Sequence, residues 1–388
     1  MKTRTALCLV LAMVSAPLCA DAARYAYVGT YNPNGEGVYR FAVNPEDGSL
    51  SARTLVSGVS NPAQLVANAA GTLLFVGSEV ADFNGGQQGG LSAYRINPQD
   101  GSLTLLNQVT SAGQGPVWLS LTPNEKFLLV ANYVSGSVAA FPVAADGKLG
   151  AAVSVQQQQG EPGAARPAAA VEGSFAISDH NGPHAHMIES DPSGRFAFST
   201  DLGLDRIYQW RRDPATGALT PNDPPFIPAA SPGAGPRHLV FHPTGDTLFV
   251  IAEEASVVTS YRLNRETGTL TPLHSLSSLP PEYQGTSFAA GLVLGRDGQN
   301  LYVANRLHNS IGQIAVTPEG GMRWVGEVWT RGDYPRSLTL DPAGKTIYVM
   351  NQRSDNITRF RVDPTHGTLT FTGDYTPVGS PSQLIMVP

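Results

Sequence analysis

Hydrophobic residues occur along this chain in short runs, and a turn containing glycine or proline follows each run. Residues 257–263 (VVTSYRL) are one such run, rich in β-branched and aromatic side chains with polar ones between them. This composition and spacing are typical of a half-buried β-strand. No long segment has the three- to four-residue spacing of an amphipathic helix, so the pattern predicts an all-β chain.

A short hairpin phrase, most often Asp or Thr followed by Gly, a variable residue and Leu, separates pairs of these runs. Its glycine supplies the positive φ that a tight turn between antiparallel strands requires. The phrase occurs seven times, at Gly48, Gly101, Gly147, Gly217, Gly268, Gly320 and Gly367. Successive glycines are 53, 46, 70, 51, 52 and 47 residues apart, so the repeat after Gly147 carries an insertion.

A second turn, Pro-x-Gly, precedes another strand-like run in most repeats, as at residues 191–194, 242–245 and 341–344. Each repeat therefore contains four strands. Four antiparallel strands repeated about every 40–50 residues predict a β-propeller, here with seven blades. Residues 380–386 have the pattern of a first strand and residues 25–30 that of a second strand, so the two ends of the chain should complete one shared blade.

Composition supports this interpretation, because 41 Gly and 30 Pro in 388 residues, with only 14% charged residues, favour a turn-dense β chain. We expect one domain over residues 23–388 with an inserted loop around residues 153–181. That loop, rich in Gln, Ala and Gly, could cover the central channel or could be a disordered surface loop without a role.

The first 22 residues have the pattern of a secretory signal peptide. Lys2 and Arg4 precede an apolar stretch over residues 6–14, and a small-residue cleavage site follows near Ala22. The apolar stretch is too short to span a bilayer, and no later stretch is long enough either. We therefore expect a periplasmic or secreted protein without a membrane anchor.

Cleavage would remove both cysteines, Cys8 and Cys19, so thiol catalysis and disulfides are not expected in the mature chain. It would also remove Lys2, Arg4 and Asp21, which changes 25 basic and 31 acidic residues to 23 and 30, a net charge of −7. This balance, without a basic stripe, excludes nucleic acid as an expected partner.

Because repeats superpose, counting back six residues from the proline of each Pro-x-Gly turn gives the start of each innermost strand. The turn glycine serves for alignment in blades where the proline is absent. The positions reached are Val117, His186, Arg237, Arg336, Ala63, Ala290 and Ser382. One histidine and two arginines therefore share a predicted ring around the channel.

Counting forward eight residues from the glycine of each Pro-x-Gly turn or its equivalent, past the second strand, gives a second ring. Its members are Glu79, Glu253, Arg306 and Gln352, with Tyr31, Tyr133 and Leu202 at equivalent positions. Glu254 adjoins Glu253, but strand alternation lets only one of them face the channel and the register selects Glu253. If both rings face one side, they line a single funnel. The alternative is that these charges form ordinary solvated salt bridges.

His184 and His186, with His180 nearby, could also be metal ligands, because alternate residues of a strand point the same way. The spacing places no carboxylate where it would be a suitable third ligand. We therefore predict neither a metal site nor a cofactor.

With these residues in view, the chain resembles the seven-bladed propeller lactonases, a family that includes 6-phosphogluconolactonases and fungal carboxymuconate-lactonising cyclases. The resemblance rests on residues 27–31 (YVGTY), 182–186 (GPHAH), 235–238 (GPRH), 252–253 (AE), 304–306 (ANR), 309–311 (NSI), 351–352 (NQ) and 354–357 (SDNI). The family site is attributed to a histidine, two arginines and a glutamate. Motif by motif, these fall on His186, Arg237, Glu253 and Arg306.

Two positions differ from the common family pattern. Family members commonly read Asn-Glu-Leu where this chain has residues 252–254 (AEE), and they commonly carry Glu where this chain has Gly291. These differences bear on the substrate more than on the fold.

The resemblance implies a lactone hydrolase. We expect Glu253 or His186 to be the general base with the other as proton donor, while Arg237 and Arg306 polarise the carbonyl or bind an acidic substituent. Further substrate contacts are expected from His184, Arg336, Glu79, Tyr133 and Gln352.

Export makes a non-phosphorylated sugar lactone a better expected substrate than a phosphorylated cytoplasmic metabolite. Two alternatives stay open at this point. One is a muconate-type cycloisomerase, which closes a lactone with similar acid and base groups. The other is a non-catalytic exported propeller that binds a protein or a glycan. A closed ring needs no partner for stability, so we expect a monomer.

Overall fold

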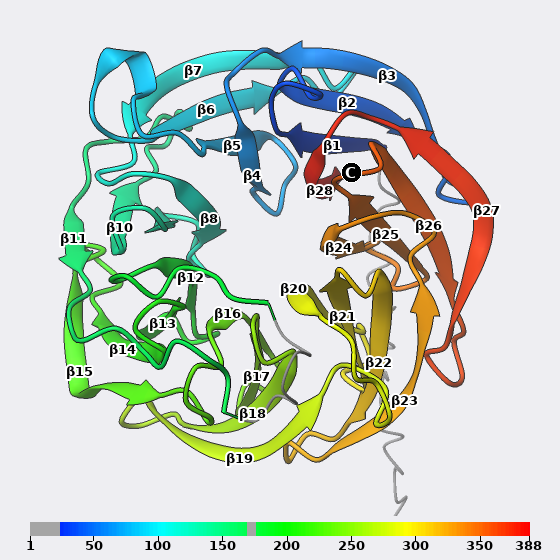
Figure 1. Cartoon of the computed structure of the whole chain (residues 1–388). Helices are drawn as coiled ribbons and strands as arrows, with labels where there is room; N and C mark the ends of the chain where they lie inside the picture. The colour runs from blue at the N-terminus through cyan, green and yellow to red at the C-terminus, as the bar shows by residue number, and fades with distance from the viewer. Residues whose placement is uncertain (1–23, 169–175) are drawn as a thin grey trace, which may run out of the picture.

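Seven four-stranded antiparallel sheets surround a common axis in the computed structural model of this protein (Figure 1). The structure describes residues 24–168 and 176–388. The predicted all-β, seven-bladed propeller is therefore confirmed. The expected signal peptide, residues 1–22, lies outside the described residues. In the part of the chain that is described, no helix is long and apolar enough to cross a membrane.

Each blade runs from an innermost strand at the axis to an outer strand at the rim (Figure 1). The innermost strands are β28 (Pro381–Val387), β4 (Pro62–Ala67), β8 (Pro116–Leu121), β12 (Ala185–Ser190), β16 (Pro236–Phe241), β20 (Phe288–Leu294) and β24 (Pro335–Leu340). The second strands are β1 (Tyr25–Thr30), β5 (Leu73–Ser78), β9 (Phe127–Asn132), β13 (Phe196–Asp201), β17 (Thr247–Ala252), β21 (Asn300–Arg306) and β25 (Thr346–Asn351).

The outer half of each blade is a hairpin. Its third strands are β2 (Val38–Val43), β6 (Gly90–Ile96), β10 (Ser137–Pro142), β14 (Arg206–Arg212), β18 (Val257–Asn264), β22 (Ser310–Val316) and β26 (Asn356–Val362). Its outer strands are β3 (Leu50–Ser57), β7 (Leu103–Thr110), β11 (Ser154–Gln157), β15 (Leu219–Pro228), β19 (Thr269–Ser277), β23 (Met322–Trp329) and β27 (Leu369–Pro377). The short 3₁₀ helix η1 (Phe83–Gly85) lies between β5 and β6.

Hairpin glycines stand where the chain has to turn back. All seven have positive φ, between 66° and 91°. Only a residue without a Cβ adopts this conformation at little cost, which explains why the phrase repeats with the blades.

The hydrophobic core lies between neighbouring blades. Second strands such as β17 are buried at every position, because blades cover both of their faces. Ile251 and Val258 of one blade, for example, pack with Leu301 and Ile314 of the next. Seven clusters of this kind form the core of the described residues.

The ring closes as the sequence predicts. Strand β28 pairs antiparallel with β1 over the register Tyr25–Val387 to Thr30–Pro381, so the first and last strands share one blade. The side-chain oxygen of Gln383 in β28 also accepts a hydrogen bond from the backbone N–H of Leu65 in the adjacent blade, at 2.6 Å.

The boundary of the insertion was wrong at its N-terminal end. Ser154–Gln157 forms β11, the outer strand of its blade, which pairs with β10. The glutamine-rich start of the segment is ordered, because pairing with β10 and the bond from Gln156 Nε2 to Leu219 O at 2.7 Å hold it in the sheet. The insertion begins after this strand.

Candidate active site

Residues of the first predicted ring share one backbone feature, a β-bulge near the start of the innermost strand. In β12 the pairing passes from Ala185 to Met187, and in β16 it passes from Pro236 to His238. The skipped residues are His186 and Arg237, and in the other five blades they are Ala63, Val117, Ala290, Arg336 and Ser382, with Gly291 skipped beside Ala290. A bulge re-aims a side chain out of the regular pleat, and bulges are frequent beside active sites.

Arg237, Glu253 and Arg306 form a buried ion triad. Glu253 Oε2 accepts a hydrogen bond from Arg237 Nε at 2.5 Å and lies 2.7 Å from Arg306 Nη2. None of the three side chains is more than 5% exposed. Arg237 comes from the first ring and the other two from the second, so both rings do face one side of the propeller.

The triad keeps its carboxylate ionised. Burial alone would raise the pKa of Glu253, but Arg306 and Arg237 outweigh burial and hold the pKa below its ordinary value. A carboxylate fixed in this way is a weak base. With two cations and one anion the triad carries one net positive charge, which suits a site where negative charge develops during reaction.

The two arginines differ in their other partners. Arg306 donates from Nε to the carbonyl oxygen of Phe288 at 3.0 Å and from Nη2 to that of Ala289 at 3.1 Å, which fixes it to its own blade. Described contacts of Arg237 involve only Nε and Nη1, the latter lying 2.9 Å from His238 Nε2. The N–H donors of Arg237 Nη2 therefore have no partner among the described hydrogen bonds and can serve a ligand.

His186 lies beside the triad with a neutral imidazole. Its ring centroid is 5.2 Å from that of His238, and its Nδ1 is buried without a hydrogen-bond partner among the described residues. Burial lowers the pKa of His186 well below its ordinary value, and Arg237, His238 and Arg336 act in the same direction. A histidine that is neutral at pH 7 can accept a proton.

Tyr133 connects the histidines to the inserted segment. Its ring stacks on His184 at 4.6 Å and meets the edge of His186 at 5.6 Å, and its hydroxyl donates to Asp179 Oδ2 at 3.1 Å. Both ring nitrogens of His184 already have partners, the carbonyl oxygen of Tyr133 at 3.0 Å and Asn181 Oδ1 at 2.7 Å. His184 therefore helps to fix the position of the Tyr133 ring, and its expected contact with a substrate stays a prediction.

Glu254 is directed to the inserted segment and not to the triad, as strand alternation predicts. Its Oε2 lies 2.8 Å from His180 Nε2, and its other carboxylate oxygen accepts the backbone N–H of Ser178. The hydrogen bond to Glu254 raises the pKa of His180, although burial opposes this shift. This pair fixes the end of the insertion beside the funnel.

Arg336, Glu79 and Tyr31 form a second polar group. The Tyr31 hydroxyl donates to Glu79 Oε2 at 2.5 Å, and Arg336 Nη2 lies 3.7 Å from the same oxygen. The Arg336 guanidinium also lies over the Tyr31 ring, 4.9 Å from its centroid. Its side chain is 15% exposed, so it can reach a ligand. Gln352 Oε1 is buried without a hydrogen-bond partner in the part of the chain described.

A cavity of about 90 Å³ lies on the axis next to these groups. Arg237 and Arg336 line it together with residues that directly follow ring positions, namely Gln64, Trp118, His238, Ser337 and Gln383. These following residues lie outside the two predicted rings, which contain one residue per blade. The available signal was the phrase at residues 235–238, in which His238 follows Arg237.

Metal ligation is not supported by the described contacts. No group of three or more His, Cys, Asp or Glu side chains in residues 24–168 and 176–388 is placed to hold a metal ion. Of the histidines considered from the sequence, His180 is engaged with Glu254 and His184 uses both nitrogens within the protein.

Comparison with known proteins gives one consistent result. A family model described as lactonase, 7-bladed beta-propeller, matches residues 25–386. The 6-phosphogluconolactonase of Bacillus subtilis (strain 168) is 32% identical over 346 residues, which cover 89% of this chain and 93% of that protein.

Solved structures agree. The periplasmic gluconolactonase of Pseudomonas aeruginosa is 32% identical, with a TM-score of 0.84 over 94% of this chain and 99% of that one. A crystal structure from Bacteroides fragilis is 28% identical, with a TM-score of 0.84 over 96% and 100% of the two chains. The family-model match over residues 25–386 includes every blade that contributes to the funnel.

Proposed function

The chain belongs to the seven-bladed β-propeller lactonase family, and from this premise we propose that it hydrolyses a sugar-derived lactone in the funnel around Arg237, Glu253 and Arg306. The observation that carries the proposal is the buried, net-positive triad with the neutral His186 beside it. Together they supply a base for water, which can later return its proton to the leaving alkoxide, and a positive environment for the oxyanion.

In the proposed reaction, His186 takes a proton from water as its oxygen bonds to the acyl carbon. The carbonyl oxygen becomes an oxyanion and accepts hydrogen bonds from Arg237 Nη2. The ring C–O bond then breaks, and the leaving alkoxide takes the proton from the His186 imidazolium. The product is an open-chain hydroxy acid, whose carboxyl group releases one proton to solution at neutral pH.

Glu253 has a positioning role in this scheme. Its Oε2 bonds two guanidinium groups at once, so it fixes their separation and keeps both charges in place. We assign the base to His186 because the pKa of Glu253 is held below its ordinary value while burial keeps His186 neutral.

We propose that Arg336, Tyr133 and Gln352 contact the sugar hydroxyls or an acidic substituent, with Glu79 orienting Arg336. The Pseudomonas aeruginosa relative is named a periplasmic gluconolactonase. With the N-terminal pattern of this chain, that name favours a periplasmic enzyme acting on a non-phosphorylated aldonolactone. We also propose that the protein is a monomer, because the closed ring of blades needs no partner for stability.

The test is lactone opening by the purified protein, followed as proton release on glucono-, galactono- and 6-phosphoglucono-lactone above the spontaneous rate. His186→Asn removes the proposed base, and Glu266→Gln, at an exposed hairpin away from the funnel, is a control for substitution as such. Opening that is lost in His186→Asn and retained in Glu266→Gln supports the proposal and identifies the substrate. Failure of the wild-type protein to exceed the spontaneous rate on any lactone would overturn it.

A further inference from the structure

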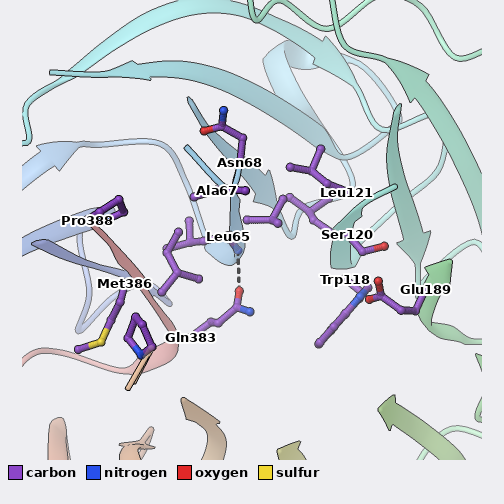
Figure 2. A pocket seen from close by; sticks show the side chains of 15 residues that line it. Leu65, Ala67, Asn68, Trp118, Ser120, Leu121, Glu189, Gln383, Met386 and Pro388 are labelled. Atoms are coloured by element: carbon purple, nitrogen blue, oxygen red, sulfur yellow. Dashed lines mark hydrogen bonds between the residues drawn. The ribbon is translucent and has the colours of Figure 1, made fainter. Parts of the chain in front are cut away.

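A second and larger cavity, of about 700 Å³, lies at the other end of the channel, and Figure 2 shows the side chains that line it. Most of its lining comes from the later residues of the innermost strands and the turns after them, such as Ala67 in β4 and Leu121 in β8. The ring that carries Arg237 lies near the starts of the same strands. The two cavities therefore open toward opposite faces of the propeller.

The charge of this cavity is opposite to that of the funnel. Among its 15 lining residues, Glu189 is the only charged side chain, and neither Lys, Arg nor His is present. Glu125 adds a second carboxylate at the edge, where its Oε1 accepts the backbone N–H of Ala69. An anionic ligand would find no countercharge here.

The walls are suited to a ligand with apolar surface. Leu65, Leu121 and Met386 line the cavity, and Figure 2 shows the Trp118 indole nitrogen beside the Glu189 carboxyl group. Trp118 and Gln383 also line the smaller cavity beside Arg237, so these two side chains separate the two spaces.

We propose that this cavity is a binding site for a small organic cation, such as a quaternary ammonium compound, held by the Glu189 carboxylate, the Trp118 indole and the apolar walls. A tryptophan ring attracts an alkylammonium group through its negative face, and the attraction strengthens away from water. Such a ligand loses its hydration on leaving water. A carboxylate in a partly apolar channel supplies a countercharge that offsets this loss.

Protonation of Glu189 should be coupled to binding. Burial raises the pKa of Glu189 to about 8, and the indole of Trp118 from the adjacent strand β8 opposes this shift. The residue paired with Glu189 on β13 is the uncharged Phe198. No basic side chain among the residues lining the cavity favours the ionised form, so a bound cation would be the first positively charged partner of Glu189.

The experiment compares choline with its neutral carbon isostere, 3,3-dimethylbutan-1-ol, by isothermal titration calorimetry on the full chain. Choline has a permanent charge, so only the protein titrates. We expect choline to bind at least tenfold more tightly than the alcohol. We also expect its affinity to rise roughly tenfold from pH 7 to pH 9 as Glu189 ionises, since a pKa near 8 gives about 10% and 90% carboxylate at these pH values.

Glu189→Gln keeps the shape and removes the charge, and Glu266→Gln is the control of equal charge change at an exposed site. We expect choline affinity to fall at least tenfold in the first variant and to stay unchanged in the second. Equal binding of choline and the alcohol by the wild-type protein would overturn the proposal, as would full choline affinity in a folded Glu189→Gln protein. Because binding is read without any lactone, the result is independent of the proposed activity.

Discussion

Arg237 Nε lies 2.5 Å from Glu253 Oε2 in an environment where both side chains are almost completely buried. Taking two such charges out of water costs several kcal/mol per ion, which their attraction offsets only when the geometry is good. Arg306 joins at the same oxygen and leaves one positive charge without a countercharge in the triad. A substrate oxyanion or carboxylate is the partner that would complete it.

Glu253→Gln should therefore affect both stability and activity. Removing one member of a buried ion group typically costs about 3–5 kcal/mol, because the remaining charges stay buried without a partner. We expect a clearly lower Tm in a thermal melt and at least a ~100-fold lower kcat/KM, as is typical for the loss of well-placed electrostatic stabilisation. Near wild-type kcat/KM in this variant would contradict the positioning role of Glu253.

Substitution of the two arginines should separate catalysis from structure. Arg237→Lys removes the Nη2 donors that we assign to the oxyanion, so we expect a ~100-fold fall in kcat with a small change in KM. Arg306→Lys loses bonds to Phe288 and Ala289, so we expect it to lower Tm more than Arg237→Lys does. Kinetics and thermal melts of both variants, measured side by side, check this. A larger loss of kcat in Arg306→Lys, with the larger fall in Tm in Arg237→Lys, would assign the oxyanion to Arg306 and the structural role to Arg237.

The dependence of activity on pH follows from His186. The base must be neutral, and burial lowers its pKa well below 6.5. We expect kcat/KM to be independent of this group above pH 6.5 and to fall only at more acidic pH. Because the folded pKa is lower than the unfolded one, the unfolded chain also binds the proton more readily, so stability decreases as pH falls through about 6.5. An acid limb centred above pH 6.5 would argue against His186 as the base.

Repetition made the fold and the two rings predictable. Each blade repeats the same bulge at the start of its innermost strand, so counting from one blade located His186, Arg237 and Arg336 in the others. Trp118 and His238 were missed because a bulge can re-aim more than one residue, and the count took one residue per blade. The contacts of His184 could not be predicted from the repeats either, because Asn181 belongs to the insertion, which has no counterpart in the other blades.

His238 provides a test of such a missed residue. It is buried and close to Arg237 Nη1, and burial, with Arg237, Arg336 and Arg306, lowers its pKa well below the ordinary value. A neutral ring can accept from the guanidinium without adding charge. We expect His238→Phe to lower kcat about 10-fold or more with little change in KM, and His238→Gln to recover part of the loss because its amide oxygen can accept. Equal activity of the two variants would exclude this positioning role.

The His180–Glu254 pair predicts that the inserted segment is held less firmly as pH rises. The hydrogen bond with Glu254 raises the pKa of His180 above 6.5, against the effect of burial, with Asp205 adding a weaker attraction. A raised folded pKa stabilises the protonated pair below about pH 6.5, and this contribution is lost as pH rises through the folded value. We therefore expect residues 176–183 to loosen between about pH 6.5 and alkaline pH.

Hydrogen exchange of the peptide over residues 176–184, corrected for the intrinsic effect of pH, measures this loosening. Glu254→Gln removes the charge that holds the proton on His180, so its exchange should be faster at low pH and should change little with pH. The Tyr133 hydroxyl bonds Asp179 in the same segment, so KM for the lactone should rise together with exchange in the wild-type protein. Exchange that is equally slow in both proteins at every pH would show that Ser178 and Asp179 hold the segment without the His180 charge.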